Sequence, residues 1–294
     1  MKIAVFTKNL TNPAYEAARL GATRAAQLLG VEVLHFVPEK GDDPQQQSAL
    51  IDAALSLVPD AFVLSPVHAT KVDGAIARIH AAGIPMTAFV NPIQAAPCVT
   101  YVSSDDYQLA GSIARYLFAH LNGRGRVLIV TGPVESFTSL ERLRGFHEAA
   151  HEHPGITLVG VIAGDYVRAT ARERTALWLQ ENAELDACLV ANDIMAVGVL
   201  EALRAAQRRA VVVGVNAIPE AISAIAQGTM LATVDFNAMQ MAFLATECAV
   251  LHLRGEQVPS TIELPVQLVD RSNYRLWDLP YAQRPLLRLK ELLP

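Results

Sequence analysis

The chain has 294 residues, of which 52% are hydrophobic and 18% charged, and its formal net charge is −5. The hydrophobic share excludes a disordered chain, and the length predicts two domains at roughly 150 residues per domain. A protein that neutralises several phosphates carries a basic patch, and this sequence has none. We therefore expect no nucleic-acid binding by this chain alone.

Strands and helices alternate along the first third of the chain. The expected strands are 2–7, 31–37, 61–64, 84–90 and 99–102, and the expected helices are 14–29, 44–57 and 71–82. The helix 14–29 illustrates the signals used. It follows Asn12 and Pro13, which favour a helix start, and it stops at Gly30, which favours a helix end.

The same alternation restarts at residue 105. The expected helices are 105–121, 139–151, 169–182, 193–206, 219–227 and 238–254, and the expected strands are 126–130, 157–162, 187–190, 211–215, 231–234 and 262–269. Strands that alternate with helices of this length predict parallel sheets with helices on both faces. Because the strands are too many for one sheet, the predicted fold class is α/β with two doubly wound lobes.

The amino terminus and the cysteines only partly indicate the cellular compartment of the protein. No apolar run reaches the roughly 18 residues of a membrane span. The short apolar run at residues 2–7 indicates a buried strand rather than the core of a signal peptide. Two possibilities stay open, a cytoplasmic protein or one whose leader has been removed. Cys98, Cys188 and Cys248 form no CxxC pair, so we interpret them as small buried side chains.

Polar and aromatic residues gather directly after the predicted strands, where ligands bind in open α/β sheets. They include Lys8, Asn9, Asn12, Tyr15, Asn91, Ser104, Asp105, Asp106, Arg142, Asp165, Tyr166, Asn192, Asp193, Asn216, Asp235, Phe236 and Asn237. Amides and carboxylates bind hydroxyls in pairs, and aromatic rings cover the C–H faces of a sugar. The set therefore favours an uncharged, polyhydroxylated ligand. The alternative for each Asn or Asp is a turn former or helix cap.

Two other patterns suggest chemistry that we do not expect. His147, Glu148 and His151 form an HExxH sequence, the pattern of zinc proteases. Their helix is expected to run away from the strand ends, so we interpret both histidines as solvated helix residues. The first strand is followed by no glycine-rich phosphate loop. The sequence therefore predicts no metal, no cofactor, no catalytic residue and no enzymatic activity.

Six segments resemble the type I periplasmic binding proteins, in particular the ribose-binding group, whose fold also forms the effector domains of LacI-type repressors. They are Asn9–Tyr15, Ser103–Asp106, Arg142–Phe146 (R-x-x-G-F), Ala191–Gly198 (A-N-D-x-M-A-x-G), Val213–Asn216 and Gly228–Val234. The segment Ala191–Gly198 is the most specific of these. The resemblance covers essentially residues 2–270 in order.

The resemblance implies two lobes that close on a small molecule, joined by chain crossings near Ser104, Asp235 and Leu264. The first lobe would comprise residues 1–104 and 237–264, and the second residues 105–236 and 265–294. The implied ligand contacts are Asn12, Tyr15, Asn91, Ser104, Arg142, Tyr166, Asn192, Asn216 and Phe236, with Lys8 and Asp235 as weaker candidates. The implied protein is a monomeric solute receptor of an ABC importer. It would bind a sugar, deoxy sugar or polyol in the cleft between its lobes and deliver it to a membrane permease.

Several departures and alternatives accompany this resemblance. The aspartate and arginine that typically follow the fourth strand are replaced by Val90 and Asn91, and Asn216 and Phe236 replace two further polar positions. Fewer carboxylates favour a smaller or partly apolar ligand. Arg142 is alternatively a structural ion-pair partner. The chain is alternatively a regulator, either a cytoplasmic LacI-type effector domain or a periplasmic sensor for a kinase. The tail 277–294 has no functional interpretation.

Overall fold

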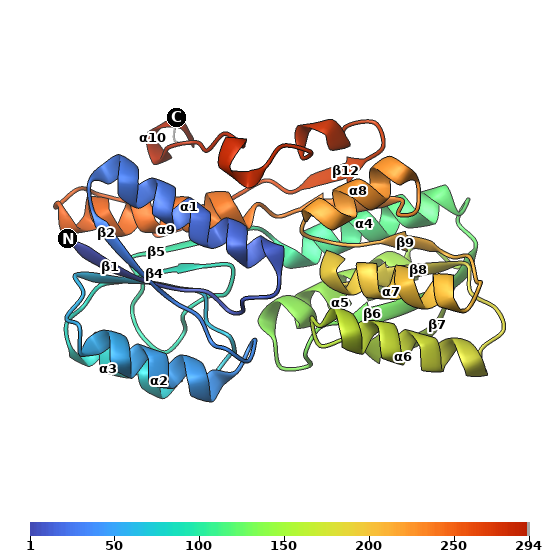
Figure 1. Cartoon of the computed structure of the whole chain (residues 1–294), viewed down its shortest axis with the longest axis horizontal. Coiled ribbons are helices and arrows are strands. Elements are labelled where there is room, and N and C mark those ends of the chain that lie inside the picture. Colours follow the sequence, from blue (N-terminus) through green and yellow to red (C-terminus); the bar gives the residue numbers. More distant parts are fainter. Residues whose placement is uncertain (293–294) are drawn as a thin grey trace. The chain divides into compact units, whose positions relative to one another are not determined.

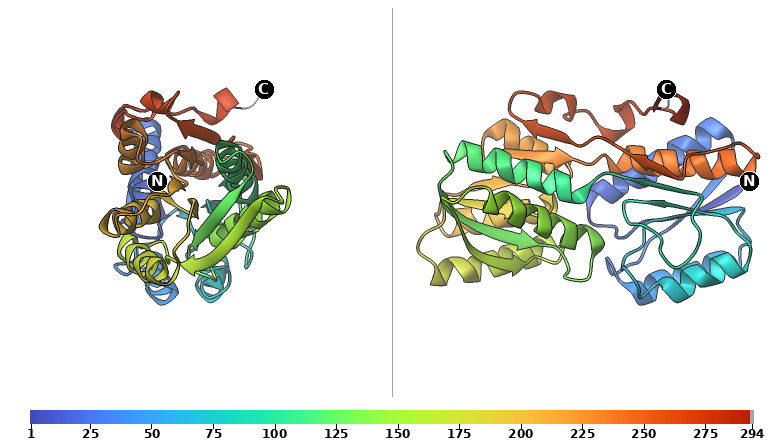
Figure 2. Two further views of the ribbon diagram at one scale, coloured as in Figure 1. Left: turned by 90° about the vertical axis from the view of Figure 1, so that its right-hand side faces the viewer. Right: turned by 180° about the vertical axis from the view of Figure 1, so that it is seen from behind.

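A computed structural model of the chain describes residues 1–292. The chain folds into two compact units, the first built from residues 1–104, 237–264 and 281–292 and the second from residues 105–236 and 265–280. Each unit holds one six-stranded sheet with helices on both of its faces, as Figures 1 and 2 show. The predicted fold class is therefore confirmed.

The sheet of the first unit is parallel throughout, in the order β11-β5-β4-β3-β1-β2. Its strands are β1 (Lys2–Phe6), β2 (Glu32–Phe36), β3 (Ala61–Leu64), β4 (Met86–Phe89), β5 (Thr100–Ser103) and β11 (Thr261–Glu263). Helices α1 (Pro13–Leu29) and α9 (Ala238–Leu253) cover one face, and α2 (Pro44–Leu55) and α3 (Asp73–Ala81) cover the other (Figure 1). Because both faces are covered, β3 and β4 are fully buried runs of mainly apolar residues.

The sheet of the second unit has the order β12-β10-β9-β8-β6-β7. Its strands are β6 (Gly125–Thr131), β7 (Ile156–Ala163), β8 (Ala187–Val190), β9 (Val211–Val213), β10 (Ala232–Asp235) and β12 (Gln267–Asp270). Helices α4 (Asp106–His120) and α5 (Phe137–His151) pair on one face. The other face carries α6 (Arg168–Glu181), α7 (Asp193–Ala205) and α8 (Pro219–Gln227), as the views in Figure 2 show.

The last predicted strand, residues 262–269, is wrong as a single element. It consists of β11, which pairs with β5 in the first unit, and β12, which pairs with β10 in the second unit. Pro265 lies between them and has no N–H for a sheet, so one continuous strand is disfavoured there. In addition, β12 runs antiparallel to β10, so the prediction of purely parallel sheets fails at this strand.

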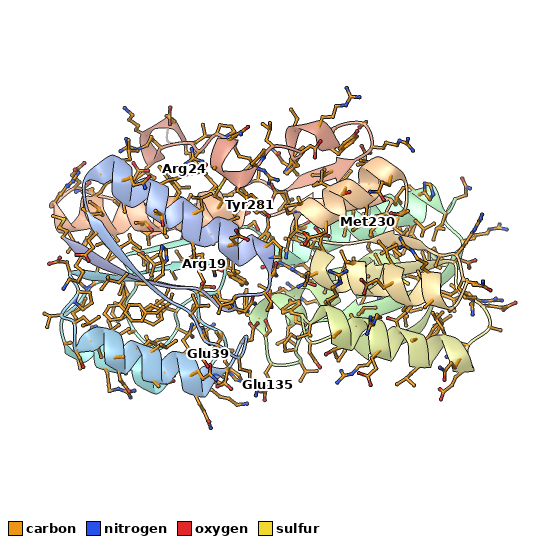
Figure 3. All side chains as sticks on the ribbon, in the orientation of Figure 1. Arg19, Arg24, Glu39, Glu135, Met230 and Tyr281 are labelled. Carbon is orange, nitrogen blue, oxygen red and sulfur yellow. The ribbon has the colours of Figure 1, made fainter. Side chains whose placement is uncertain are left out.

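The carboxyl-terminal tail also departs from expectation. The sequence placed residues 265–294 together in the second lobe, whereas residues 281–292 pack in the first unit. The cause is a set of contacts with α1 and α9, among them a hydrogen bond from the guanidinium of Arg24 to the carbonyl of Arg284 at 2.8 Å. Figure 3 labels Arg24 on α1 and Tyr281 on η2 (Tyr281–Gln283), the tail segment that packs against this helix.

Among the described residues, no helix combines the length and the apolar character needed to cross a membrane.

Candidate functional site

In the first unit, Asn12, Tyr15 and Lys8 lie in the segment that follows β1. Asn12 caps α1, because its side-chain oxygen accepts a hydrogen bond from the amide of Ala14 at 3.0 Å. Tyr15 is buried in the first turn of α1. The Lys8 ammonium, only 1% exposed, lies 2.9 Å from a carboxylate oxygen of Asp42. This ion pair balances the charge of Lys8 within the unit.

Asn91 and Ser104 follow β4 and β5, and both carry a buried polar atom that the unit itself does not use. The Asn91 side-chain N–H donates to the carbonyl of Pro66 at 2.7 Å, which fixes the orientation of the amide. Its Oδ1 has no hydrogen-bond partner among residues 1–292, and the same holds for the hydroxyls of Ser104 and Ser65. A buried polar atom without a partner costs about 1–3 kcal/mol, so these atoms favour a ligand or water that pairs with them.

The backbone just before Asn91 is strained. Val90 has φ 65°, a conformation that is unfavourable for a β-branched residue. It is held there because its N–H donates to the carbonyl of Val102 at 3.0 Å and its carbonyl accepts from the Tyr101 hydroxyl at 2.8 Å. Strain of this kind is retained where surrounding structure enforces it, which is common at functional sites.

In the second unit, Arg142 on α5 is almost completely buried. Its Nε donates to Asp106 on α4 at 2.7 Å, and a second guanidinium N–H donates to the carbonyl of Ala191 at the end of β8 at 2.6 Å. Its Cζ lies 5.4 Å from the centre of the Phe236 ring. The structural ion pair, which the sequence left open as the alternative role of Arg142, is therefore present. Arg142 also lies beside Phe236, another predicted ligand contact.

Gly145 explains how α5 comes close enough for this ion pair. A Cβ at Gly145 would lie 2.3 Å from the carbonyl oxygen of Tyr107, so only glycine permits this approach of α4 and α5. The glycine of the R-x-x-G-F segment is thus one turn from Arg142 and places it beside Asp106.

Asn192 and Asp193 begin α7, and both have structural partners. Asn192 caps the helix by accepting from the amide of Met195 at 3.1 Å. Both carboxylate oxygens of Asp193 accept from the Thr233 hydroxyl, at 2.8 and 2.9 Å, and one also accepts from the amide of Ile218 at 3.2 Å. Complete burial raises the pKa of Asp193 to about 7, although these hydrogen bonds oppose the shift. The cap alternative therefore holds for Asn192, as it does for Asn12.

Asn216 lies in a strained turn that Asp193 and Thr233 hold in place. Asn216 has φ 118° and Ala217 has φ 51°. The Ala217 N–H donates to the Thr233 hydroxyl at 3.3 Å, and the Asn216 N–H donates to the carbonyl of Val234 at 2.7 Å. The Oδ1 of Asn216 is buried and, within the described chain, has no hydrogen-bond partner. Asn216 thus resembles Asn91: a fixed backbone presents an unused acceptor.

Tyr166 and Asp235 complete the predicted set. The Tyr166 hydroxyl lies 3.0 Å from that of Thr138, and its ring packs directly on Gly132, where a Cβ would lie 2.3 Å away. Asp235, the last residue of β10, accepts a hydrogen bond from the indole N–H of Trp277 at 2.7 Å. The tail residue Trp277 therefore occupies one carboxylate oxygen of Asp235, which is one of the two weaker candidates for a ligand contact.

The predicted residues divide into one set per unit, which we call the polar face of that unit, and most of them lie at or just after the carboxyl end of a strand. The face of the first unit contains Lys8, Asn12, Tyr15, Asn91 and Ser104, and that of the second contains Arg142, Tyr166, Asn192, Asn216, Asp235 and Phe236. Sequence reasoning missed the roles of Asp42 and Asp106 as partners of the two buried cations. It also missed Ser65, whose position directly after β3 was the available signal. That these faces bind a ligand stays a prediction.

The HExxH sequence lies on α5, where His147 is half-buried and Glu148 and His151 are exposed. In the described part of the chain, no group of three or more histidine, cysteine, aspartate or glutamate side chains is arranged to hold a metal ion.

Known proteins resemble the chain over most of its length. Residues 3–257 match the periplasmic binding protein domain. The ribose import binding protein RbsB of Bacillus subtilis is 25% identical over 267 residues, which cover 90% of this chain and 86% of that protein. The D-apiose import binding protein of Actinobacillus succinogenes is 29% identical over 212 residues, covering 72% of this chain and 68% of that protein.

Solved structures also resemble the chain over most of its length. The crystal structure of an ABC transporter periplasmic solute binding protein from Actinobacillus succinogenes 130z, with bound D-allose, has a TM-score of 0.87 and 26% identity to this chain. The match covers 93% of this chain and 99% of that one.

Proposed function

Because this chain belongs to the periplasmic binding protein family, we propose that it binds a small neutral sugar or polyol and delivers it to an ABC importer. The family membership confirms the resemblance found in the motifs. The relatives named above are import binding proteins, which favours transport over the regulator alternative. The proposal includes a membrane permease as partner, action as a monomer in the periplasm, and no chemical change of the ligand.

The observation that carries the proposal is the pair of unused buried acceptors, Asn91 Oδ1 in the first unit and Asn216 Oδ1 in the second. An amide oxygen accepts hydrogen bonds and cannot donate them, so the matching ligand presents hydroxyl or N–H donors. The hydroxyls of Ser104 and Ser65 supply further groups for such a ligand in the first unit. A carboxylate or phosphate group on the ligand carries only acceptors, so it could not pair with the amide oxygens of Asn91 and Asn216.

The charges on the two faces favour a neutral ligand over a charged one. The buried cation of the first face, Lys8, is paired with Asp42, and that of the second, Arg142, is paired with Asp106. Each cation thus has a carboxylate of its own and leaves little net charge to attract an ionic ligand. Phe236 adds an apolar surface of the kind that covers sugar C–H groups.

The test is a ligand panel of D-ribose, D-apiose, D-allose, L-glutamate and L-arginine, read by thermal unfolding and by calorimetric titration. A ligand at 100 times its Kd stabilises the folded state by about 2.7 kcal/mol, which gives a clear shift in Tm. We expect stabilisation by at least one neutral sugar and by neither amino acid. Stabilisation by the charged amino acids alone contradicts the proposal.

A further inference from the structure

The tail 271–292 follows the last strand, lies beyond the matched region 3–257, and has no part in the function proposed above. It begins in the second unit and enters the first at residues 280/281. The described chain therefore passes between the units at 104/105, 236/237, 264/265 and 280/281, one passage more than the motifs imply. This additional passage is what the tail contributes to the architecture.

The first part of the tail is fixed to the end of β10 in the second unit. The Trp277 indole N–H donates to Asp235 at 2.7 Å, and the Trp277 ring packs in a cluster with Ala217 and Val269. Asp235 directly precedes Phe236, and Ala217 directly follows Asn216. Trp277 thus donates a hydrogen bond to one predicted ligand contact, Asp235, and packs in a cluster with the residue next to another, Asn216.

The second part of the tail is fixed to the start of α9 in the first unit. The side chain of Gln240 exchanges two hydrogen bonds with the backbone of Leu287, each 2.7 Å long. Farther along α9, the buried carboxylate of Glu247 pairs with Arg288 and accepts from the amide of Leu289 at 2.9 Å. Gln240 lies only three residues after Asn237, whose side chain caps α9.

We propose that the tail is a strap that fixes both ends of the chain connection 235–240 and so positions it. Trp277 holds the start of that connection at Asp235, and Leu287 holds its end at Gln240. The tail between these anchors contains more residues than the connection itself, so it acts through the hydrogen bonds at its two anchors and not through its length. Phe236 lies inside the connection and stacks on Arg142, so the strap positions a predicted ligand contact.

The test needs no ligand and therefore separates failure of the strap from failure of the proposed function. Amide hydrogen exchange is measured by mass spectrometry on peptides covering residues 235–240, in the full chain without added sugar. Trp277→Phe keeps the ring and removes the N–H donor. A second variant, Gln240→Leu, keeps a side chain of similar size and removes both hydrogen bonds to Leu287. We expect exchange of residues 235–240 to accelerate about three- to tenfold in both variants.

Two controls test whether the change in exchange is confined to residues 235–240. Arg78→Ala, which removes an exposed ion pair with Asp52, is expected to leave exchange of residues 235–240 at the wild-type rate. Peptides covering β3 are expected to exchange equally slowly in all variants, because β3 is buried in the first unit far along the sequence from the tail. Unchanged exchange in either anchor variant contradicts the proposal. Faster exchange in β3 as well contradicts it too, since that result indicates general destabilisation.

Discussion

Arg142 and Asp106 form an ion pair with a separation of 2.7 Å, and each side chain is only 3% exposed. The pair joins α5 to α4, and the second hydrogen bond of Arg142 to Ala191 joins it to the end of β8. The guanidinium is therefore fixed from two directions beneath the ring of Phe236. This arrangement predicts that stability and ligand binding depend on the same contact.

Asp106→Asn is expected to lower the free energy of unfolding by about 3–5 kcal/mol, because it leaves the Arg142 charge buried without its carboxylate. It is also expected to weaken sugar binding, since Arg142 loses its fixed position. Urea unfolding and calorimetric titration measure the two effects. The matched control is Arg78→Ala, which removes an ion pair with Asp52 whose members are about half exposed. That variant is expected to bind and unfold like the wild type. Wild-type stability of Asp106→Asn would show that the pair is not structural.

Asn216→Gly is expected to separate binding from stability. Glycine adopts the φ of 118° without strain, and the change removes a buried acceptor that lacks a partner within residues 1–292. We expect stability within about 1 kcal/mol of the wild type and sugar affinity lower by about 1–3 kcal/mol. Asn122→Gly is the control, because Asn122 has φ 54° in a turn after α4, outside both polar faces. Equal affinities of the two variants would remove Asn216 from the site.

Asp193 predicts a specific dependence of stability on pH. The carboxyl of an unfolded aspartate titrates near 3.8, and burial raises the folded-state pKa of Asp193 to about 7. Between these values the folded chain keeps a proton that the unfolded chain has lost. The contribution of Asp193 to stability is therefore complete below pH 3.8 and is lost as the pH rises through about 7.

The measurement is urea unfolding at several pH values between 4.5 and 8, for the wild type and Asp193→Asn. Carboxylates with lowered pKa values, such as Glu152 and Glu201, shift stability in the opposite direction but do so in both proteins. The difference between the two proteins is expected to change across this range in the direction given above. A difference that is constant with pH contradicts the assignment to Asp193.

The sequence predicted the two lobes and most elements because alternating apolar strands and capped helices are local signals. The end of helix α1 at Gly30 and the cap at Asn12 are examples. The split of residues 262–269 into β11 and β12 was not predicted, because their pairing with β5 and β10 is set by contacts far along the chain. The docking of the tail by Gln240 and Leu287 was missed for the same reason.

The candidate site was predicted in part. Residues after strands reach the same edge of a parallel sheet, so Asn91, Ser104 and Asn216 could be placed by their position alone. Ion pairs between side chains on different helices could not be predicted from position along the chain. Asp106 becomes the partner of Arg142 only because Gly145 allows α4 and α5 to approach closely.

The most direct test of the account is a calorimetric titration of the panel sugar that binds most tightly, against the wild type, Asn91→Ala and Asn216→Gly. These variants remove one unused acceptor from the first unit and one from the second. We expect sugar affinity to fall about 5- to 150-fold in each variant, equivalent to about 1–3 kcal/mol. Wild-type affinity in either variant contradicts the central claim that these unused buried acceptors bind the sugar.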